Sequence, residues 1–485
     1  MKITFISPYA AISNFAVRSL STILRNTGHQ TNVICLSSPI FEGINGNTKI
    51  INNKELIGQI EDIAGDSDMI GITLMSCHFP AMSELTRILK KLNKPIIWGG
   101  IHPTLLPEES LQYADIVCMG EGEDAILELA QRIETGEDPY SIQNLWFRGH
   151  NRNPIRVLTA ECNFPMLDYG PDGHFAYDEK QKRLVAIKSL EHYQEFLVPP
   201  VWMPGRPKNV IYQIELSRGC PYRCTFCCNN MLRKIFPGRY LRFKPMSRIK
   251  EELLWAKKVF TELNGIIIEC DTLNAYPDLK ELCRFLREEI QLPFTCLLTP
   301  FNTTDELLAM LVQAGLWRVQ FGLQSKSHEI EKLYGRERLN QNMDKIFTFL
   351  KKYNDRLWPR IDVIINCPWE KPYQTLQTVK FLNKHLPKRF TVDIFSLVLL
   401  PGSELWERAE KDGLLDPQGY LRTFEWSDLD EIQYTTILLS LLNKGFPRKL
   451  LWLLANKPMV SLFSQRFFTR GLFPRMIHAI KKPLH

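Results

Sequence analysis

The sequence of 485 residues lacks any apolar run long enough to cross a membrane, since no 18 consecutive residues are apolar. Its first eight residues also fall short of the hydrophobic region of a secretory signal peptide. The twelve cysteines show no paired framework of the kind that staples small secreted domains. We therefore expect a cytoplasmic protein whose cysteines stay reduced.

The C-terminal end lacks acidic residues, because Glu431 is the last one in the chain. The nine basic residues beyond it account for the net charge of +7, since the other 51 basic residues are outnumbered by 53 acidic ones. These nine are Lys444, Arg448, Lys449, Lys457, Arg466, Arg470, Arg475, Lys481 and Lys482. The body of the chain is slightly acidic and shows no nucleic-acid-binding module, so we expect no nucleic acid partner.

Aromatic and aliphatic residues alternate with cations in this tail, for example at 449–454 and 467–473. A basic helix without acids suits peripheral contact with an anionic membrane surface, such as the inner face of the cell membrane. It suits equally a helical cap over the mouth of a barrel, with its cations at the rim. We predict a cap over residues 406–485 and keep membrane contact as the alternative.

The first 140 residues predict a doubly wound α/β domain. Short apolar runs at 3–7, 31–36, 69–75, 95–98 and 116–119 are separated by helical patterns. Strands that are apolar throughout belong to parallel sheets covered on both faces, and five such units make a flavodoxin-like or Rossmann-like domain. Ligands of these sheets bind at the carboxyl ends of the strands, here the loops at 8–14, 76–80, 99–103 and 120–123. No G-x-G-x-x-G follows the first strand, so a dinucleotide is disfavoured.

A second α/β series follows a segment, 141–205, that has weak periodicity and is predicted to be a linker. Six strands are expected at 211–216, 265–270, 293–299, 317–323, 360–366 and 391–399, with helices between them. Six units fall short of the eight of a closed barrel. We therefore predict an open barrel over residues 206–405.

Three cysteines, Cys220, Cys224 and Cys227, have the spacing C-x3-C-x2-C in a stretch, 219–227, that we call the cysteine loop. A structural zinc site normally has four protein ligands, often from two CxxC pairs, and no second pair is present. A [4Fe-4S] cluster needs a ligand for each of its four irons, so three thiolates leave one iron open for chemistry. Cys228 follows directly and is interpreted as a bystander.

The cysteine loop resembles that of radical S-adenosylmethionine (SAM) enzymes, including the aromatic Phe226 before the third cysteine. The resemblance implies that Cys220, Cys224 and Cys227 ligate a [4Fe-4S] cluster and that SAM binds the open iron. One electron from a reductant such as flavodoxin or ferredoxin then cleaves SAM to a 5′-deoxyadenosyl radical. It also implies the open six-unit barrel, with the cysteine loop after its first strand.

The N-terminal domain resembles the cobalamin-binding domain that precedes many radical SAM domains, through G-G-x-H-P-T at 99–104 and G-E-G-E at 120–123. On this resemblance, Ser76, Gly99, Gly100, His102, Gly120 and Glu121 are candidate cobalamin contacts. The cobalt-binding D-x-H-x-x-G motif is absent; the nearest string, at 172–174, lies in the predicted linker and lacks its glycine. We therefore expect no histidine on cobalt, and a structural role for His102 is favoured over ligation.

Contacts to SAM carry over from the family only at matching positions. Asp271, after the second strand of the barrel, is expected to accept a hydrogen bond from SAM, with a solvated acid as the alternative. After the fourth strand, Gly322, Gln324 and Ser325 stand where the family often shows G-I-E-S. The segments 366–370 and 401–405 resemble the family's G-x-P-x-E and P-G-T-x-L, whereas 298–302 lacks an expected basic residue.

Together these resemblances imply a cobalamin-dependent radical SAM enzyme, most readily a methyltransferase acting on an unactivated carbon of a secondary metabolite or lipid-like molecule. One alternative is a cyclase or rearranging enzyme that does not use cobalamin as methyl donor. The other is a non-enzymatic, cluster-bearing redox sensor or binding protein. The sequence does not name the substrate.

Overall fold

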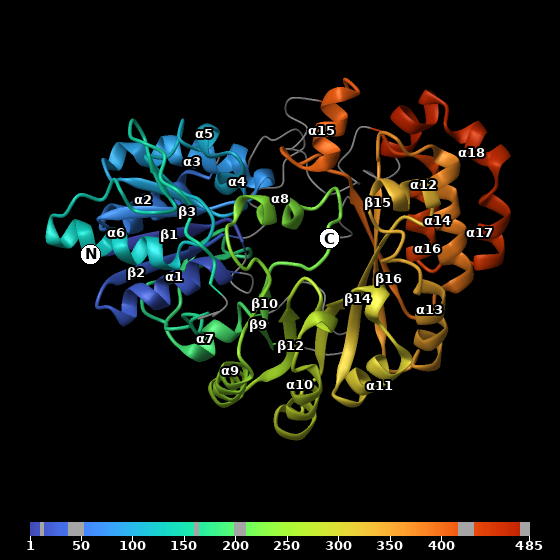
Figure 1. The fold of residues 1–485 in the computed structure, drawn as a ribbon, viewed down its shortest axis with the longest axis horizontal. Coiled ribbons are helices and arrows are strands. Elements are labelled where there is room, and N and C mark those ends of the chain that lie inside the picture. Colours follow the sequence, from blue (N-terminus) through green and yellow to red (C-terminus); the bar gives the residue numbers. More distant parts are fainter. Residues whose placement is uncertain (10–13, 37–52, 160–163, 198–209, 416–430, 476–485) are drawn as a thin grey trace. The chain divides into compact units, whose positions relative to one another are not determined.

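A computed structural model describes residues 1–9, 14–36, 53–159, 164–197, 210–415 and 431–475 of the chain. The chain divides into two compact units. The first consists of residues 1–219 and 231–267, and the second of residues 220–230, 268–419 and 423–485, within the described ranges. Figure 1 shows the elements of both units.

The first unit is built around an eight-stranded sheet with strand order β6-β5-β4-β3-β1-β2-β7-β8. Its elements up to the second sheet are β1 Lys2–Ser7, α1 Phe15–Asn26, β2 Gln30–Cys35, α2 Lys54–Gly65, β3 Met69–Thr73, α3 Phe79–Leu89, β4 Ile96–Gly99, α4 Ile101–Leu105, α5 Pro107–Ser110, β5 Ile116–Cys118, α6 Glu123–Thr135, β6 Leu145–Phe147, β7 His174–Asp178, β8 Arg183–Ala186 and α7 Leu190–Gln194.

The central five strands confirm the predicted doubly wound fold. Strands β1 to β5 pair in parallel, and their order 2-1-3-4-5 is that of flavodoxin-like sheets. Each of them overlaps one of the five predicted apolar runs. The point at which the strand order reverses lies between β1 and β3, so the loops after these two strands border the expected ligand position.

The described parts of the predicted linker, residues 141–159 and 164–197, differ from the prediction because they add strands to both edges of this sheet. β6 pairs antiparallel with β5, β7 pairs parallel with β2, and β8 pairs antiparallel with β7. These strands are only three to five residues long and lie at or near an edge. Short edge strands are buried on fewer sides, so their sequences show little of the continuous apolar pattern that marked the central ones.

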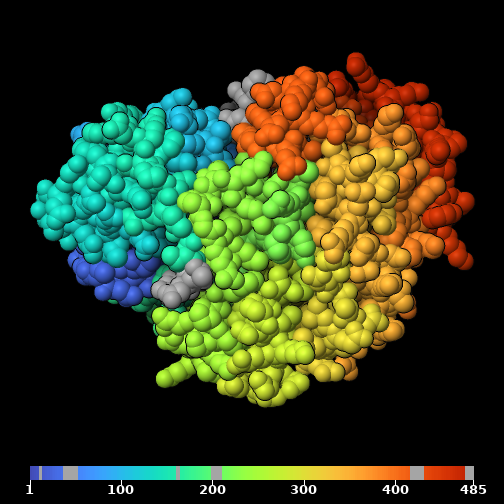
Figure 2. All heavy atoms as spheres, viewed as in Figure 1, coloured from blue at the N-terminus to red at the C-terminus, as the bar shows by residue number. Residues whose placement is uncertain are grey.

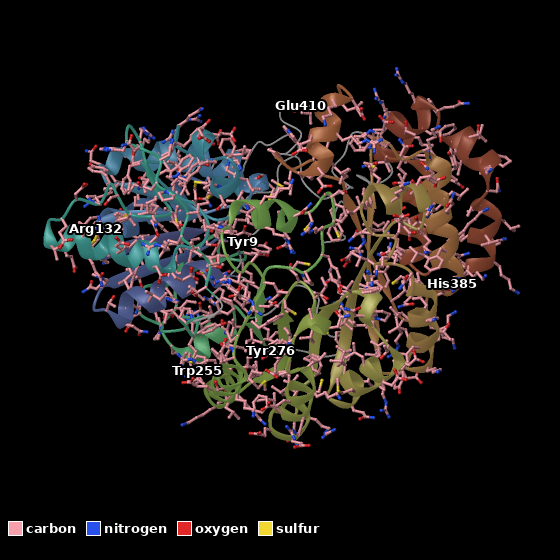
Figure 3. The ribbon with its side chains drawn as sticks, viewed as in Figure 1. Tyr9, Arg132, Trp255, Tyr276, His385 and Glu410 are labelled. Carbon is pink, nitrogen blue, oxygen red and sulfur yellow. The ribbon has the colours of Figure 1, made fainter. Side chains whose placement is uncertain are left out.

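Buried polar contacts fasten the segment 164–197 to the first unit. Arg18 of α1 is fully buried and its guanidinium lies over the rings of Tyr169, at 4.5 Å, and Tyr193, at 4.9 Å. Asp168 accepts a hydrogen bond from Ser21 and pairs with His174 at 3.2 Å. Trp255, labelled in Figure 3, extends the aromatic cluster by packing against Tyr169.

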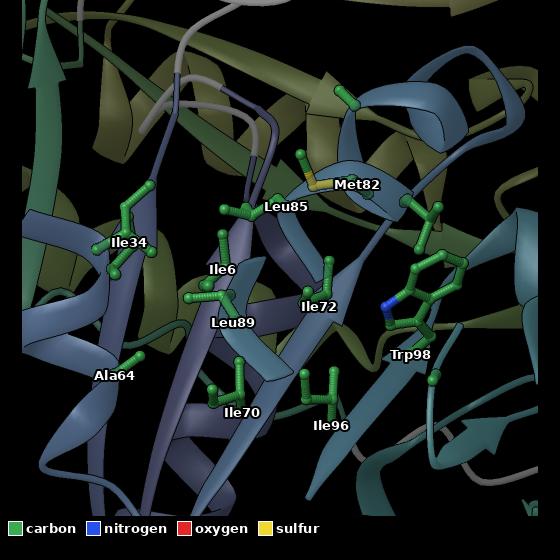
Figure 4. Close-up of a cluster of buried hydrophobic side chains, with 14 of the residues drawn as sticks. Ile6, Ile34, Ala64, Ile70, Ile72, Met82, Leu85, Leu89, Ile96 and Trp98 are labelled. Atoms are coloured by element: carbon green, nitrogen blue, oxygen red, sulfur yellow. The ribbon is translucent and has the colours of Figure 1, made fainter. Parts of the chain in front are cut away.

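The core on one face of this sheet consists almost entirely of aliphatic side chains from strands β1 to β5 and helices α2 and α3 (Figure 4). Ile6, Ile70, Ile72 and Ile96 project from neighbouring strands and are at most 2% exposed. Trp98 is the large exception, and its indole nitrogen donates to Thr86 Oγ1 at 3.0 Å. Apolar burial of this extent is the main stabilising term for such a sheet.

The second sheet has six strands in the order β9-β12-β13-β14-β15-β16, as the open barrel requires. β13 to β16 pair in parallel. β10 and β11 pair antiparallel with each other in a separate two-stranded sheet. Of the elements in this region, β9, β10, β11, α9 and most of α8 and β12 belong to the first unit. The elements are β9 Val210–Glu215, β10 Ser217–Arg218, α8 Cys228–Ile235, β11 Arg242–Phe243, α9 Met246–Val259, β12 Leu263–Glu269, α10 Leu279–Phe285, β13 Phe294–Leu298, α11 Asp305–Gln313, β14 Leu316–Gln324, α12 His328–Leu333, α13 Met343–Lys352, β15 Trp358–Ile365, α14 Pro372–His385 and β16 Thr391–Ser396.

The C-terminal region is helical, as predicted, with α15 Glu404–Lys411, α16 Tyr434–Asn443, α17 Arg448–Leu454 and α18 Lys457–Phe463. Helices α16, α17 and α18 pack on α14, and α16 also contacts β16 (Figures 1 and 2). They therefore cover the outer side of the barrel's last unit rather than its mouth, which corrects the prediction of a cap. The apolar face of α16, with Leu438, Leu439 and Leu442 buried, explains the position.

No helix of the described residues has the length and apolar character needed to span a membrane.

We predict that Ile70→Ala lowers the free energy of unfolding of the first unit by about 2–5 kcal/mol, because it leaves a cavity in a fully buried site. Ile133→Ala on α6 is the control, since Ile133 is 41% exposed and its truncation should cost little. Urea unfolding followed by circular dichroism measures both. Equal losses in the two variants would contradict the assignment of this core.

Candidate functional site

The carboxyl end of β4 brings two glycines to the edge of the first sheet. Gly100 has a φ of +103°, and a Cβ there would lie 2.8 Å from the Leu74 carbonyl oxygen. Only glycine adopts this conformation without strain and allows such a close approach. A Cβ at Gly99 would meet nothing nearer than 3.9 Å. The glycine pair thus leaves bare backbone at the edge where a doubly wound sheet binds its ligand.

Ser76 and His102, two predicted cobalamin contacts, bond to each other beneath this edge. His102 Nδ1 lies 3.1 Å from Ser76 Oγ, and its Nε2 lies 3.5 Å from a carboxylate oxygen of Glu109. His102 is fully buried in α4 beside the ring of Phe79, and burial lowers its pKa to about 4. These contacts fit the structural role favoured for His102.

Gly120 and Glu121, after β5, lie against neighbours within the first unit. Gly120 has a φ of +80°, and a Cβ there would clash with the Phe236 ring at 2.3 Å. The Glu121 carboxylate accepts hydrogen bonds from Arg242 and lies 3.4 Å from a guanidinium nitrogen of Arg218. The Glu121 side chain therefore forms ion pairs with two arginines. The sequence had predicted that it contacts a cofactor.

The string at 172–174 that partly matched a cobalt-binding motif lies in β7 and the turn before it. The ring of His174 is 1% exposed and is held between Asp168, at 3.2 Å, and Tyr193, at 3.3 Å. The pKa of His174 is lowered by burial. This histidine is part of the core of the first unit, in agreement with the expectation that it does not bind cobalt.

The cysteine loop has no helix or strand from 219 to 227, and its three cysteines differ in exposure. Cys224 is 8% exposed, whereas Cys220 and Cys227 are partly accessible. Among the described residues no three His, Cys, Asp or Glu side chains already stand in a metal-binding arrangement. The donor set itself, three thiols on one loop, is the one that a three-ligand [4Fe-4S] cluster requires.

The C-terminal end of α12 holds the middle of the cysteine loop. Thr225 donates its backbone N–H to the Tyr334 carbonyl at 3.2 Å and its hydroxyl to the Leu333 carbonyl at 2.7 Å. The Phe226 ring packs edge-on against Tyr334, with ring centroids 5.1 Å apart. Phe226 thus anchors the loop in the second unit's core instead of facing a ligand with its whole ring.

Three side chains act as hydrogen-bond donors to the predicted cluster cysteines. Arg336, just past α12, places its Nη1 3.2 Å from Cys224 Sγ. The thiol of Cys228 donates to Cys227, and with Asn229 it lowers the pKa of Cys227 to about 7 despite burial. The interpretation of Cys228 as a residue that is not a cluster ligand stays a prediction. Burial has the opposite effect at Cys220, whose pKa rises to about 12.

The predicted SAM contacts divide into accessible and buried groups. Asp271 is exposed at the end of β12, and its negative charge raises the pKa of Cys220. Gln324 has a φ of +64° at the end of β14, beside an irregularity in strand register, and its Oε1 is buried without a hydrogen-bond partner among the described residues. A Cβ at Gly322 would lie 2.8 Å from the amide nitrogen of Gln324. Such an unsatisfied amide oxygen fits a donor on a bound ligand.

Ser325 belongs to a buried network instead. It is 1% exposed, and its hydroxyl donates to Glu370 Oε1 at 3.3 Å. Burial raises the pKa of Glu370 to about 8, although hydrogen bonds from Ser325 and Thr375 oppose the shift. Glu370 is the acid of the G-x-P-x-E-like segment, so this segment keeps a protonated carboxyl next to the predicted SAM contacts at physiological pH.

Arg336 and Asn340 were not found from the sequence. Cys224 and Arg336 are 112 positions apart, and nothing in the sequence around Arg336 marks it as a neighbour of the cysteine loop. The sequence offered only the glycine before it, Gly335. The structure shows why a glycine stands there, since its φ is +65° and a Cβ would lie 3.3 Å from the Arg223 carbonyl oxygen. A glycine at such a close approach between two segments often marks a functional turn.

Comparison with known proteins supports both domains. The B12 binding domain model matches residues 1–130, and the Radical SAM superfamily model matches residues 214–382. The chain thus carries both domains and is homologous to cobalamin-dependent radical SAM methyltransferases. The predicted order of the two domains is therefore confirmed, as are cobalamin, a [4Fe-4S] cluster and SAM as the cofactors of these families.

Individual relatives are distant. The chain is 21% identical over 364 residues to bacteriochlorophyllide d C-8(2)-methyltransferase of Chlorobaculum tepidum, covering 72% of this chain and 70% of the relative. It resembles the radical SAM methyltransferase TsrM from Kitasatospora setae, solved with cobalamin and a [4Fe-4S] cluster, with a TM-score of 0.61 at 17% identity, over 84% and 75% of the two chains. The cobalamin-dependent enzyme OxsB, solved with aqua-cobalamin and SAM, gives a TM-score of 0.55 at 16% identity, over 92% and 62%. At these sequence identities, both structural comparisons show similarity of fold alone.

We predict that Glu370→Gln changes the pH dependence of stability. The carboxyl stays protonated in the folded chain up to about pH 8 but loses its proton near pH 4.3 in the unfolded chain. The folded state then binds more protons between these values, so wild-type stability falls as pH rises through this range. The glutamine variant lacks this loss and should gain stability relative to wild type between about pH 5 and pH 8.

Urea unfolding at about pH 5 and at about pH 8 measures the difference in stability between the variant and the wild type. Glu410→Gln, which removes an exposed carboxylate from α15 (Figure 3), is the control for the loss of one charge. A stability difference between Glu370→Gln and wild type that is the same at both pH values would contradict the raised pKa.

Proposed function

We propose that this chain is a cobalamin-dependent radical SAM methyltransferase that adds a methyl group to an unactivated carbon of a small molecule. The observation that carries the proposal is the pairing, in one chain, of a B12-binding domain with a radical SAM domain whose loop offers three cysteines. The named methyltransferases it resembles, from Chlorobaculum tepidum and Kitasatospora setae, support methyl transfer as the reaction class.

In this proposal Cys220, Cys224 and Cys227 hold the cluster, and Asp271, Gly322 and Gln324 hold SAM. Cobalamin would lie at the edge that carries Gly99, Gly100 and Gly120, where the open space at Gly99 leaves its backbone accessible. When bound, the cluster and SAM supply a radical that removes hydrogen from an inert carbon, and cobalamin supplies the methyl group. An electron donor such as flavodoxin or ferredoxin is the expected protein partner.

The protein's own part is positioning. The unsatisfied amide oxygen of Gln324 is suited to accept a hydrogen bond from an amino or hydroxyl group of SAM. Ser325, the residue after Gln324, is fixed by its hydrogen bond to Glu370, and Gln324 itself has a left-handed backbone conformation. Because these groups are fixed before a ligand arrives, little ordering is needed on binding.

We predict that Cys224→Ala abolishes the formation of 5′-deoxyadenosine from SAM, because a cluster with two protein ligands does not retain the open iron needed for SAM. The assay uses the full chain, reconstituted anaerobically with iron and sulfide and purified with hydroxocobalamin. Cys283→Ala, which alters a buried cysteine in α10 outside the cysteine loop, is the matched control and should retain activity.

The product mass tests methyl transfer itself. A gain of one CH2 in the substrate supports it, whereas a product of another mass favours a cyclase or rearranging enzyme. Full activity without a bound corrinoid, read from the visible spectrum, contradicts the role of cobalamin. A chain that binds a cluster but never cleaves SAM is a redox sensor or binding protein instead.

The tail supports a second, independent proposal: peripheral contact with an anionic membrane, which suits a lipid-like substrate. On α17, Leu450, Trp452 and Leu453 are 49%, 50% and 68% exposed, and the neighbouring Lys449 is exposed as well. Phe467, after α18, is 71% exposed. No acidic residue lies in this region to repel anionic headgroups, so apolar insertion and electrostatic attraction act together.

We predict that the double substitution Leu453→Ser and Phe467→Ser weakens flotation with vesicles containing anionic lipid, because it removes two apolar side chains available for insertion. Leu254→Ser, at a residue 44% exposed on α9, is the control. Truncation after Glu431 should abolish flotation, and raised salt should weaken it. Equal flotation of wild type, double variant and truncated chain would contradict membrane contact through the tail.

A further inference from the structure

Arg336 is a buried cation that donates a hydrogen bond to a cluster cysteine. It is 7% exposed, and its three hydrogen bonds go to Cys224 Sγ, the Gly322 carbonyl and Asn340 Oδ1. The contacts to Cys224 and Asn340 measure 3.2 Å and 3.3 Å. Two of these partners are neutral oxygens, so the thiol is the one partner able to carry a negative charge.

The absence of a carboxylate makes this arrangement unusual. Among the described residues, no carboxylate lies within ion-pair distance of Arg336. By contrast, Arg218 and Arg242 of the first unit both pair with the carboxylate of Glu121. A guanidinium stays protonated at any physiological pH, and a buried charge is costly unless it is paired. The charge of Arg336 also acts on the buried Asp362 carboxyl, which lies beyond ion-pair distance. A thiolate at Cys224, shared with a cluster that is itself negatively charged, supplies a counter-charge within hydrogen-bond distance.

The position of Arg336 is fixed by the same contacts that hold the cysteine loop. Tyr334 and Leu333 receive the hydrogen bonds of Thr225, and the chain then turns at Gly335 past the Arg223 carbonyl. Arg336 N–H closes the turn by donating to the Glu331 carbonyl at 2.8 Å. Asn340 is fully buried and bonds to the carbonyls of Leu323 and Ser325, so its contact with the guanidinium is also rigid.

We propose that Arg336 is a positioning residue that sets the reduction potential of the cluster by donating a charged hydrogen bond to the Cys224 sulfur. The inference rests on the proposed function, since it requires the cluster. Hydrogen bonds to cluster sulfurs and nearby charge are among the factors that set cluster potentials. Adding an electron makes the cluster more negative, so a fixed cation at this distance stabilises the reduced state and raises the potential.

The experiment is a reductive titration of the full, anaerobically reconstituted chain, followed by electron paramagnetic resonance. In Arg336→Gln we expect the ratio of reduced to oxidised cluster at a fixed potential to fall about tenfold, equivalent to about 59 mV for one electron. Arg338→Gln is the matched control: Arg338 is exposed, lies over the Phe301 ring at 4.3 Å and should leave the potential unchanged.

Arg336→Lys keeps the charge but cannot reach the sulfur, Gly322 and Asn340 together, so its potential should lie between those of Arg336→Gln and wild type. Iron content and thermal melting show whether Arg336→Gln folds. If it does not, the potential of Arg336→Lys is the measurement that tests the inference. Potentials equal to wild type in both variants overturn the inference. So does weaker SAM binding at an unchanged potential, which would assign the arginine to SAM.

Failure of the proposed function gives a different result. A wild-type chain that takes up no cluster overturns both proposals together. A wild-type cluster that cleaves SAM, with a potential that Arg336 does not influence, overturns this inference alone.

Discussion

The docking of the cysteine loop on the end of α12 is the contact on which the proposed chemistry depends. A loop with neither helix nor strand from 219 to 227 cannot by itself hold three thiols for one cluster. Thr225 ties its middle to two carbonyls at the end of α12, and Phe226 buries its ring against Tyr334. The backbone N–H of Leu405 also reaches the Thr225 carbonyl, at 3.4 Å. The loop is therefore held by two later segments of the chain.

Four arginines in this protein, all with little or no exposure, are balanced in three different ways. Arg218 and Arg242 pair with the Glu121 carboxylate, which is the common solution. Arg18 lies between the rings of Tyr169 and Tyr193, where the aromatic faces attract the cation. Arg336 instead directs its charge at a thiol. The three cases show that the same residue type stabilises the fold at two places and faces a reactive group at the third.

Much of the fold could be predicted because apolar runs identify central strands. β1 to β5 and the six strands of the second sheet all overlap the predicted stretches, since strands buried on both faces are apolar throughout. The short strands β6, β7 and β8 escaped prediction because edge strands need no such run. The tail was correctly predicted to be helical, but its place on α14 depends on which apolar face finds a partner.

The sequence by itself determined the donor chemistry: three cysteines at C-x3-C-x2-C, glycines at strand ends, and a tail with nine cations and no acids. These are local features, encoded in spacing and residue type. Only the tertiary structure decided which side chains were available to a ligand. It bound Glu121 to arginines, buried Ser325 beside Glu370 and left the Gln324 amide oxygen without a partner among the described residues. It also brought Arg336 to Cys224 across 112 positions, because packing, unlike spacing, joins segments that are distant in the chain.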